Sequence, residues 1–277
     1  MTYIENVTIG TDVEFFVADD AGEIVSAEGF IRGSKDNPYK FVEDNPYFAT
    51  QLDNVLAEGN IPPCTNRDEW HDNILFLRNA IQRQLPTGYR TVACASAELH
   101  ERFLTFQAQR FGCDPSYNVW TGKVIPVSPT KRFIRSAGFH VHVGYTNPTK
   151  PKNVLIAKFL DLHLGVASVL LEPESLRQSL GYGAAGNFRH QKHGVEYRVL
   201  SSYFASTPAL VRWTYDTAVS AVGRLNFART AGNIAAYLAY GERAQNVINT
   251  RNTREARNLA TTFNVALPQE VQRVNLV

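Results

Sequence analysis

Hydrophobic and polar residues alternate in several short stretches of the first half of the chain, a pattern that predicts β-strands. The clearest stretch is residues 7–17, where apolar side chains fall on odd positions while Asp12 and Glu14 fall between them. A turn at residues 19–22 predicts a hairpin return directly after it. Further strands are predicted over residues 51–58, 91–100, 138–145 and 194–200.

Helical spacing of apolar residues dominates the second half of the chain. One helix is predicted earlier, over residues 67–85 with Asn66 as its N-cap, and residues 153–171 are expected to form a core helix. Pro208 suits the first turn of a further helix, and Asn252 begins a capping box for the last one. Strands followed by helices predict an α+β protein.

No internal repeat and no linker rich in Gly, Ser or Pro divides the sequence. Residues 1–277 are therefore expected to form a single catalytic domain whose C-terminal part, about 206–277, is helical.

Composition narrows the function classes. The chain has 28 Lys and Arg against 26 Asp and Glu, so no global field favours nucleic acid or a membrane surface as a partner. The three cysteines form no CxxC pair and are odd in number, which favours a reducing compartment and inert thiols. No basic N-terminal region precedes an apolar run, so we expect a cytoplasmic protein.

Charged or imidazole side chains recur two residues apart in the predicted strands, with apolar residues between them. Because side chains alternate across a sheet, each such set shares one face. The sets are Asp12 with Glu14, His140 with His142, Glu196 with Arg198, and Ser96 with Glu98 and His100.

One set of this kind is typical of a solvated sheet face. Four sets are different, because carboxylates and histidines would repel or desolvate one another unless a cation lay among them. Oxygen donors with few sulfurs favour Mg²⁺ or Mn²⁺ over zinc. The pattern predicts an antiparallel sheet that packs on helices through its apolar face and lines a metal-binding cavity with the other.

Residues 181–186, Gly-Tyr-Gly-Ala-Ala-Gly, have the spacing of a dinucleotide-binding loop. That loop works only when a buried strand enters the glycines and a helix leaves them. Here residues 172–180 are polar, and residues 187–193 show no helical period. The dinucleotide interpretation is therefore disfavoured.

Six segments in a fixed order resemble the phage-encoded type 2 COOH-NH2 ligase family: TDVEFF, DNVLAEGNIPP, SAELH, GCDPSYNVW, RSAGFHVHVGY and GNFRHQKHGVEYRVLSS. That family belongs to the superfamily of glutamine synthetase and glutamate-cysteine ligase, and the likeness covers about residues 7–205. It implies a glutamine synthetase-like curved antiparallel sheet, with a concave active-site face and helices packed on the other face.

The resemblance also implies chemistry. The concave face would bind ATP with Mg²⁺ or Mn²⁺ and join a carboxylate to an amine through an acyl phosphate. The substrates would be small molecules or peptides that supply these two groups. A phage-encoded member would act in the host cytoplasm, and many superfamily members are homo-oligomers.

The positions of individual residues in these segments indicate which of them form the site. The metal ligands expected from the resemblance are Asp12, Glu14, Glu58, Glu98, His140 and Glu196, with Asp12 standing where several relatives have Glu. ATP or phosphate contacts are expected from Lys35, Arg135, His140, His142 and Arg198, although Lys35 also fits an exposed turn lysine. Arg189, Glu196 and Arg198 are expected to act in catalysis by stabilising charge on the phosphoryl group.

Other interpretations stay open. Residues 181–186 fit a mobile lid that brings Arg189 over the triphosphate, or an ordinary loop. A metal-dependent hydrolase or amidase would use the same His-x-His strand with scattered carboxylates to activate water. A non-catalytic binding protein that retains the fold is a third class. The identities of the substrates are not encoded in any of these patterns.

Overall fold

The computed structural model describes residues 3–103, 105, 116–125, 133–173, 177 and 181–268. Its main feature is a large antiparallel sheet of strand order β3-β4-β5-β1-β11-β13-β12-β8-β9, and β2 and β6 pair with the far end of β1. The strands are β1 Thr8–Ala18, β2 Ile24–Val25, β3 Tyr39–Lys40, β4 Ala49–Asp53, β5 Leu56–Asn60, β6 Arg90–Val92, β8 Ser116–Asn118, β9 Val124–Ile125, β11 Phe139–Gly144, β12 Asn187–Gln191 and β13 Gly194–Tyr197. Strands β7 Ser96–Glu98 and β10 Ile134–Ser136 form a separate two-stranded sheet.

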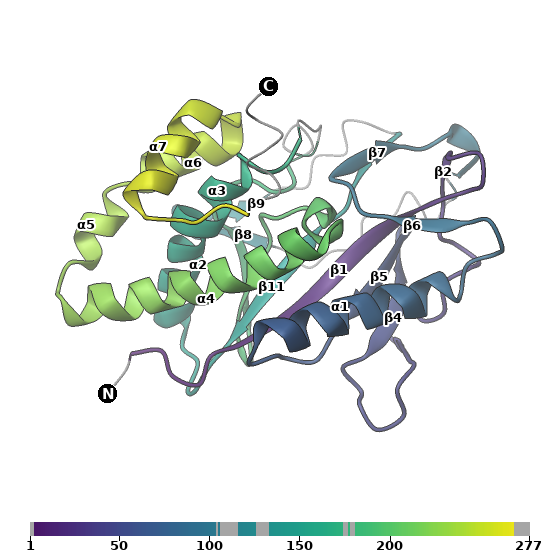
Figure 1. Ribbon diagram of the computed structural model, residues 1–277, viewed down its shortest axis with the longest axis horizontal. Helices are drawn as coiled ribbons and strands as arrows, with labels where there is room; N and C mark the ends of the chain where they lie inside the picture. Colours follow the sequence, from purple (N-terminus) through teal and green to yellow (C-terminus); the bar gives the residue numbers. More distant parts are fainter. Residues whose placement is uncertain are drawn as a thin grey trace.

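Helices cover one face of the large sheet, as Figure 1 shows for α1 and α4, which cross in front of β1, β5 and β11. The helices are α1 Arg67–Gln82, α2 Lys150–Leu160, α3 Val166–Ser168, α4 Pro208–Thr230, α5 Ile234–Leu238, α6 Gly241–Thr250 and α7 Thr253–Thr262. The mixed architecture and the helical C-terminal part agree with the sequence pattern. Among the described residues, none of the helices combines the length and apolarity that crossing a membrane requires.

Local signals explain where the helices begin. The Asn66 side chain accepts a hydrogen bond from the Glu69 amide at 2.8 Å and caps α1. Thr207 caps α4 one residue before Pro208, and Asn252 caps α7 by accepting from the Glu255 amide. These three predicted starts are confirmed.

The core lies between the helices and the odd-numbered face of β1. Val13, Phe15 and Val17 are fully buried there, together with Phe139 and Val141 of β11. Burial of such side chains supplies the main drive for folding, about 1.5–3 kcal/mol for each. The alternation predicted for residues 7–17 is therefore confirmed, and it leaves the even-numbered positions on the other face.

Two predicted strands are corrected by the structure. Residues 51–58 are not one strand: β4 and β5 form a hairpin, and Asn54 adopts φ 58° at its turn. Asn tolerates this left-handed conformation, so Asp53-Asn54 was the turn signal. Residues 91–100 are likewise interrupted, and β6 and β7 belong to different sheets.

The predicted core helix at 153–171 is confirmed, with a change of winding. Between α2 and α3 the chain forms one π-helical segment, Asp161–Gly165. His163 of this segment is buried among the rings of Phe159, Tyr237 and Phe263, and its Nδ1 lies 2.8 Å from the Phe159 carbonyl. His163 is therefore a core residue.

Burial of His163 predicts a pH-dependent stability. Burial lowers the pKa of His163 from 6.5 to about 4, so the unfolded chain binds a proton between these values while the folded chain does not. Stability contributed by the neutral ring is complete above pH 6.5 and falls as the pH drops toward 4. We expect wild type to lose roughly 2 kcal/mol more than His163→Phe between pH 7.5 and 4.5. Urea unfolding at both pH values measures this difference. The control is His100→Asn, at an exposed position, which should keep the wild-type dependence of stability on pH. If wild type and His163→Phe lost the same stability between the two pH values, the prediction would be contradicted.

Candidate functional site

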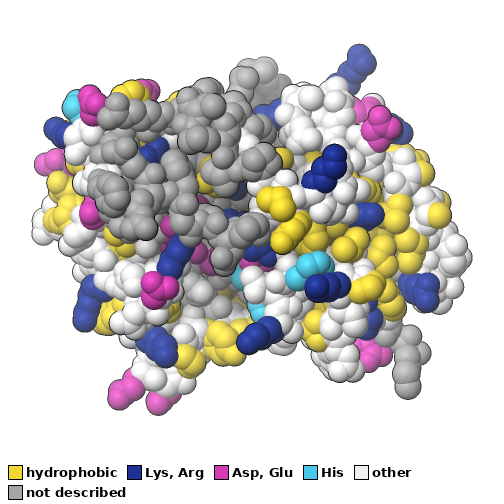
Figure 2. Space-filling view, turned by 180° about the vertical axis from the view of Figure 1, so that it is seen from behind, with side chains coloured by type: hydrophobic (Ala, Val, Ile, Leu, Met, Phe, Trp, Pro, Cys, Tyr) yellow, Lys and Arg dark blue, Asp and Glu magenta, His cyan; other side chains and the backbone are white. Residues whose placement is uncertain are grey.

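Strand register gathers polar side chains on the sheet face opposite the helices. Asp12 of β1 stands across from His140 of β11, and His142 stands across from Glu196 of β13. On the other side of β1, Glu14 stands across from Glu58 of β5. Figure 2 shows the molecule from behind, where histidine, acidic and basic side chains lie close together near the centre. Three of the four predicted polar sets therefore meet on one face.

Asp12, His140 and Glu196 form the centre of this face. One ligand atom from each lies within 4.8 Å of the others. His140 Nδ1 is 3.1 Å from Asp12 Oδ2 and 3.8 Å from Glu196 Oε1. The His140 and Glu196 side chains are almost fully buried, while Asp12 keeps some access to solvent. We refer to these three residues as the central cluster.

Glu196 is held by three neighbours. Arg198 donates to its Oε1 in a short ion pair, and Arg189 Nη1 lies 3.4 Å from the same oxygen. Gln191 donates to Oε2 at 2.6 Å. Arg198 Nη1 is also 3.2 Å from His140 Nδ1, so Arg198 touches two members of the central cluster. The predicted set of Arg189, Glu196 and Arg198 is brought together at one point.

His142 connects the central cluster to His193 in the turn between β12 and β13. Its Nε2 makes a short hydrogen bond with Asp12, and its Nδ1 lies 3.2 Å from Nε2 of His193, whose ring stacks on it. Both ring nitrogens therefore have protein partners. His142 positions Asp12 in this arrangement.

Neighbouring positive charges keep the two carboxyls of the central cluster ionised. Burial opposes ionisation of Asp12, but the charges of His142 and His140 overcome it and hold the Asp12 pKa well below its usual value. Burial and the Asp12 charge oppose ionisation of Glu196, yet Arg198 and His140 still lower its pKa. Both carboxyls are therefore anionic near neutral pH.

Glu58 and Glu14 extend the acidic surface beside Asp12. Burial, followed by the charges of Asp12, Asp53 and Glu14, raises the Glu58 pKa well above its usual value. Gln51 donates to Glu58 Oε2 at 2.7 Å, and the Gly138 amide donates to Glu14. Glu58 therefore experiences more negative charge than its protein partners neutralise, as expected of carboxylates grouped to hold a cation.

A divalent metal ion fits the central cluster by its donor chemistry. Two carboxylates and an imidazole suit Mg²⁺ or Mn²⁺, and zinc also accepts such a set. Ligand atoms at about 2.2 Å from an ion lie at most roughly 4.4 Å apart, so the three side chains need only a small inward movement. Both Asp12 oxygens and Glu196 Oε2 keep a lone pair beyond their present hydrogen bond, whereas Glu196 Oε1 already accepts from Arg198 and Arg189.

Three predicted site residues lie elsewhere. Glu98 is exposed on β7 of the two-stranded sheet, so the prediction that it shares one sheet with the other polar sets is wrong. Lys35 pairs with Asp53 at 3.1 Å near the β4–β5 turn. Arg135 is buried on β10 and donates to the Asn54 side chain at 3.0 Å. Lys35 and Arg135 therefore both contact the region of the β4–β5 turn.

Two residues that shape the site were not predicted from the sequence. Arg177 is fully buried, within electrostatic reach of Glu172 and Glu14, and its Nε has no hydrogen-bond partner in the described part of the chain. Gly138 leaves space for the His140 ring, because a Cβ there would lie 2.4 Å from His140 Nε2. The Gly-Phe-His-Val-His spacing was the available signal for Gly138.

Residues 181–186 are packed rather than open. A Cβ on Gly183 would lie 2.0 Å from Arg177 Nη1, and one on Gly186 would lie 2.8 Å from the Trp120 ring. Both glycines have positive φ, which other residues adopt at a cost. Arg189 lies on strand β12 across from Glu196, so it is positioned by the sheet and not by this loop. The lid interpretation placed Arg189 on the wrong kind of element.

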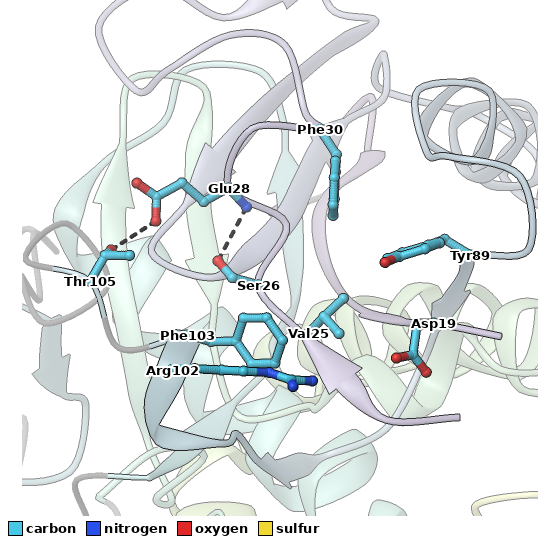
Figure 3. Close-up of a pocket in the computed structure, with 9 residues that line it drawn as sticks. All are labelled: Asp19, Val25, Ser26, Glu28, Phe30, Tyr89, Arg102, Phe103 and Thr105. Atoms are coloured by element: carbon cyan, nitrogen blue, oxygen red, sulfur yellow. Dashed lines mark hydrogen bonds between the residues drawn. The ribbon is translucent and has the colours of Figure 1, made fainter. Parts of the chain in front are cut away.

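Two cavities lie near β1. One, of about 310 Å³, is partly lined by His142 and so adjoins the central cluster. The other, of about 500 Å³, lies by β2, where Phe30, Tyr89 and Phe103 surround Val25 (Figure 3). None of the predicted site residues lines this second cavity.

Comparisons with known proteins bear on this geometry. Residues 123–230 match a family model described as phage phiEco32-like COOH.NH2 ligase-type 2, a segment that carries His140, Glu196 and Arg198. No curated protein matches the chain significantly. Among solved structures, the chain is similar to a bifunctional glutathione synthetase from Pasteurella multocida, with a TM-score of 0.50 and 14% identity over 97% of this chain and 48% of that one. The chain thus spans about half the length of that structure, and a likeness at this identity concerns the fold alone.

Gly138 offers a test of the central cluster that removes none of its donors. Gly138→Ala should displace the His140 ring and weaken Mn²⁺ binding about tenfold, a loss comparable with that of an outer-shell partner. Isothermal titration calorimetry with MnCl₂ measures the affinity. Gly223→Ala on α4 is the matched control, because a Cβ there meets no atom within 4 Å. Equal Mn²⁺ affinity in both variants, with wild-type circular dichroism spectra, would mean that His140 does not contribute to the site.

Proposed function

We propose that the protein is an ATP-dependent carboxylate–amine ligase that forms an amide or peptide bond through an acyl phosphate. The observation that carries this proposal is the central cluster: two anionic carboxylates and an imidazole within 4.8 Å, with a guanidinium in direct contact. The match of residues 123–230 to a COOH.NH2 ligase family model supports it. A glutamine synthetase-like curvature of the sheet, with this face concave, belongs to the same proposal.

The chemistry explains why acids and bases must stand together. A carboxylate is a poor electrophile, so transfer of the γ-phosphoryl group of ATP to one of its oxygens makes a carbonyl that an amine can attack. Phosphate then leaves with the bonding electrons, and the amine loses a proton. Three anionic groups, from ATP, the substrate and the protein, must therefore occupy one site.

Each residue of the site has a separate role in the proposed reaction. Asp12, Glu196 and His140 would hold the metal ion, with Glu14 and Glu58 beside them. When bound, the ion neutralises phosphate oxygens and polarises them for transfer. Arg198, fixed by Glu196 and close to His140, would donate to the transferring phosphoryl oxygens. Arg189 stands on the neighbouring strand and would do the same from the other side.

A covalent enzyme intermediate on sulfur is disfavoured at the described cysteines. Burial raises the pKa of the Cys64 and Cys94 thiols to about 11. A thiolate would therefore be scarce at neutral pH. This agrees with direct attack by the amine on a phosphorylated carboxylate.

Hydroxylamine provides a general test, because it captures acyl phosphates as hydroxamates whatever the natural amine is. We expect hydroxamate formation from a panel of amino acids only when ATP and Mg²⁺ or Mn²⁺ are both present. Glu196→Gln should lower the rate by about 10²–10³-fold, since Gln cannot supply the charge that holds the ion and Arg198. The colour of the ferric hydroxamate and release of phosphate from ATP are the measurements.

The control is Glu23→Gln, which alters an exposed ion pair with Arg102 that includes no member of the central cluster. It should keep the wild-type rate. Hydrolysis of amides that needs metal but no ATP would support the hydrolase alternative and overturn the proposal. Absence of ATP binding by calorimetry, with Glu196→Gln no different from wild type, would favour a non-catalytic protein.

A further inference from the structure

The cavity that adjoins the central cluster is formed by the polar face of β1 and β11. Gly10 and Gly144 lie on its floor, and the ring of His142 separates it from Asp12. Gly10 stands across from His142 in the β1–β11 register and precedes Asp12 by two residues on the same face. The cavity therefore begins about 7 Å along the strand from the central cluster.

The walls of the cavity are uncharged apart from the imidazoles. No Lys, Arg, Asp or Glu is among the described residues that line it. Both nitrogens of His142 are already bonded, to Asp12 and to His193. A charged group inside would lose part of its hydration and find no Lys, Arg, Asp or Glu to pair with among these residues, which is costly.

Aromatic and apolar surfaces make up the rest of the lining. The stacked rings of His142 and His193 have centroids 5.3 Å apart, and Ile61 and Pro63 add apolar surface. Tyr47 is 60% exposed at the rim, which is unusual for a ring of that size and typical of a side chain that packs on a ligand. Thr8 and Asn60 supply the polar groups of the wall.

We propose that this cavity receives an uncharged, apolar or aromatic side chain of the amino acid or peptide substrate. The inference rests on the proposed ligase function and specifies its substrate class. A volume of about 310 Å³ is large enough to hold one such side chain.

The position of the cavity favours a side chain of the substrate over the adenine base of ATP as its occupant. In ATP, the ribose and the α-phosphate separate the base from the phosphates at the metal ion. The group attached to the reacting carboxylate or amine is instead joined directly to the reaction centre. The cavity shares the His142 wall with the central cluster, and its described lining has no Lys or Arg to hold a phosphate chain, so it suits the substrate side chain.

Gly10 makes the inference testable. A Cβ on Gly10 would meet its nearest atoms, in His142 and Pro63, at 3.7 and 3.8 Å, and Gly10 does not have a positive φ. Substitution there fills the cavity floor without strain. Valine also suits a strand, so Gly10→Val should fold.

The experiment uses the full chain with ATP, Mg²⁺ and hydroxylamine, and compares phenylalanine, leucine, alanine, glutamate and lysine as substrates. Wild type should favour phenylalanine or leucine over glutamate and lysine by at least about tenfold in kcat/KM. Gly10→Val should lower kcat/KM for phenylalanine about 10–100-fold and change that for alanine and the KM for ATP less than about threefold. Gly223→Ala is the matched glycine control and should behave as wild type. If Gly10→Val does not fold, Gly10→Ala and Thr8→Val take its place.

Binding measured without turnover separates this inference from the ligase proposal. Saturation-transfer NMR with phenylalanine should show contact with wild type and a loss of contact in Gly10→Val. Such a loss without any hydroxamate would retain the cavity assignment while the ligase proposal fails. Turnover that prefers glutamate or lysine, or that ignores Gly10→Val, would overturn the cavity assignment and leave the ligase proposal intact. A rise in the KM for ATP alone would assign the cavity to the nucleotide and overturn the inference.

Discussion

The register between β1 and its two neighbours is the constraint on which the rest of the site depends. Asp12 meets His140 on one side, Glu14 meets Glu58 on the other, and β13 then adds Glu196 across from His142. A slip of one residue would turn these side chains into the helical core and expose Val13 and Phe15. The buried apolar face therefore fixes the polar face. Stability and chemistry are set by the same strand pairing, because each strand contributes to both through alternate residues.

Burial of so many carboxylates is tolerated because each meets a positive or hydrogen-bonding partner of its own. Asp12 is held by two imidazoles and Glu196 by Arg198 and Gln191. Glu58 is the exception, since its protein partners do not offset burial and the neighbouring anions, and its pKa is raised accordingly. A residual negative charge beside the central cluster is the physical basis for expecting a cation there. Removing one partner of such a set costs more than the bond itself, because a buried charge is left uncompensated.

Sequence alternation was enough to predict which faces of β1 and β11 carry the candidate site, and the errors have a common physical origin. The faces of β1 and β11 followed from periodicity alone, because one side of each strand packs on helices and the other does not. The hairpin turn at Asn54, inside a predicted strand, was missed. Strand β12 was missed because Arg189 and Gln191 alternate with few strongly apolar residues. Glu98 shows the converse error: a strand pattern fixes which side chains share a face but not which sheet the strand joins. Arg177 could not be found, since nothing local distinguishes a buried arginine from a surface one.

The glycines at 181–186 show how a motif can carry structural meaning without its usual function. Gly186 approaches Trp120, whose indole donates to Asp161 at 2.6 Å, and the hydroxyl of Tyr197 donates to the same carboxylate at 2.7 Å. Burial, opposed by these hydrogen bonds and one from the Gly186 amide, raises the Asp161 pKa to about 6. This buried contact joins the π-helical segment, strand β13 and the turn after β8. Tyr197 lies between Glu196 and Arg198 in the chain. The packing of residues 181–186 therefore helps to position the segment that carries these two residues. The spacing of the glycines is thus a requirement of close backbone approach to Arg177 and Trp120. In the proposed function, phosphate binds on the opposite face of the sheet.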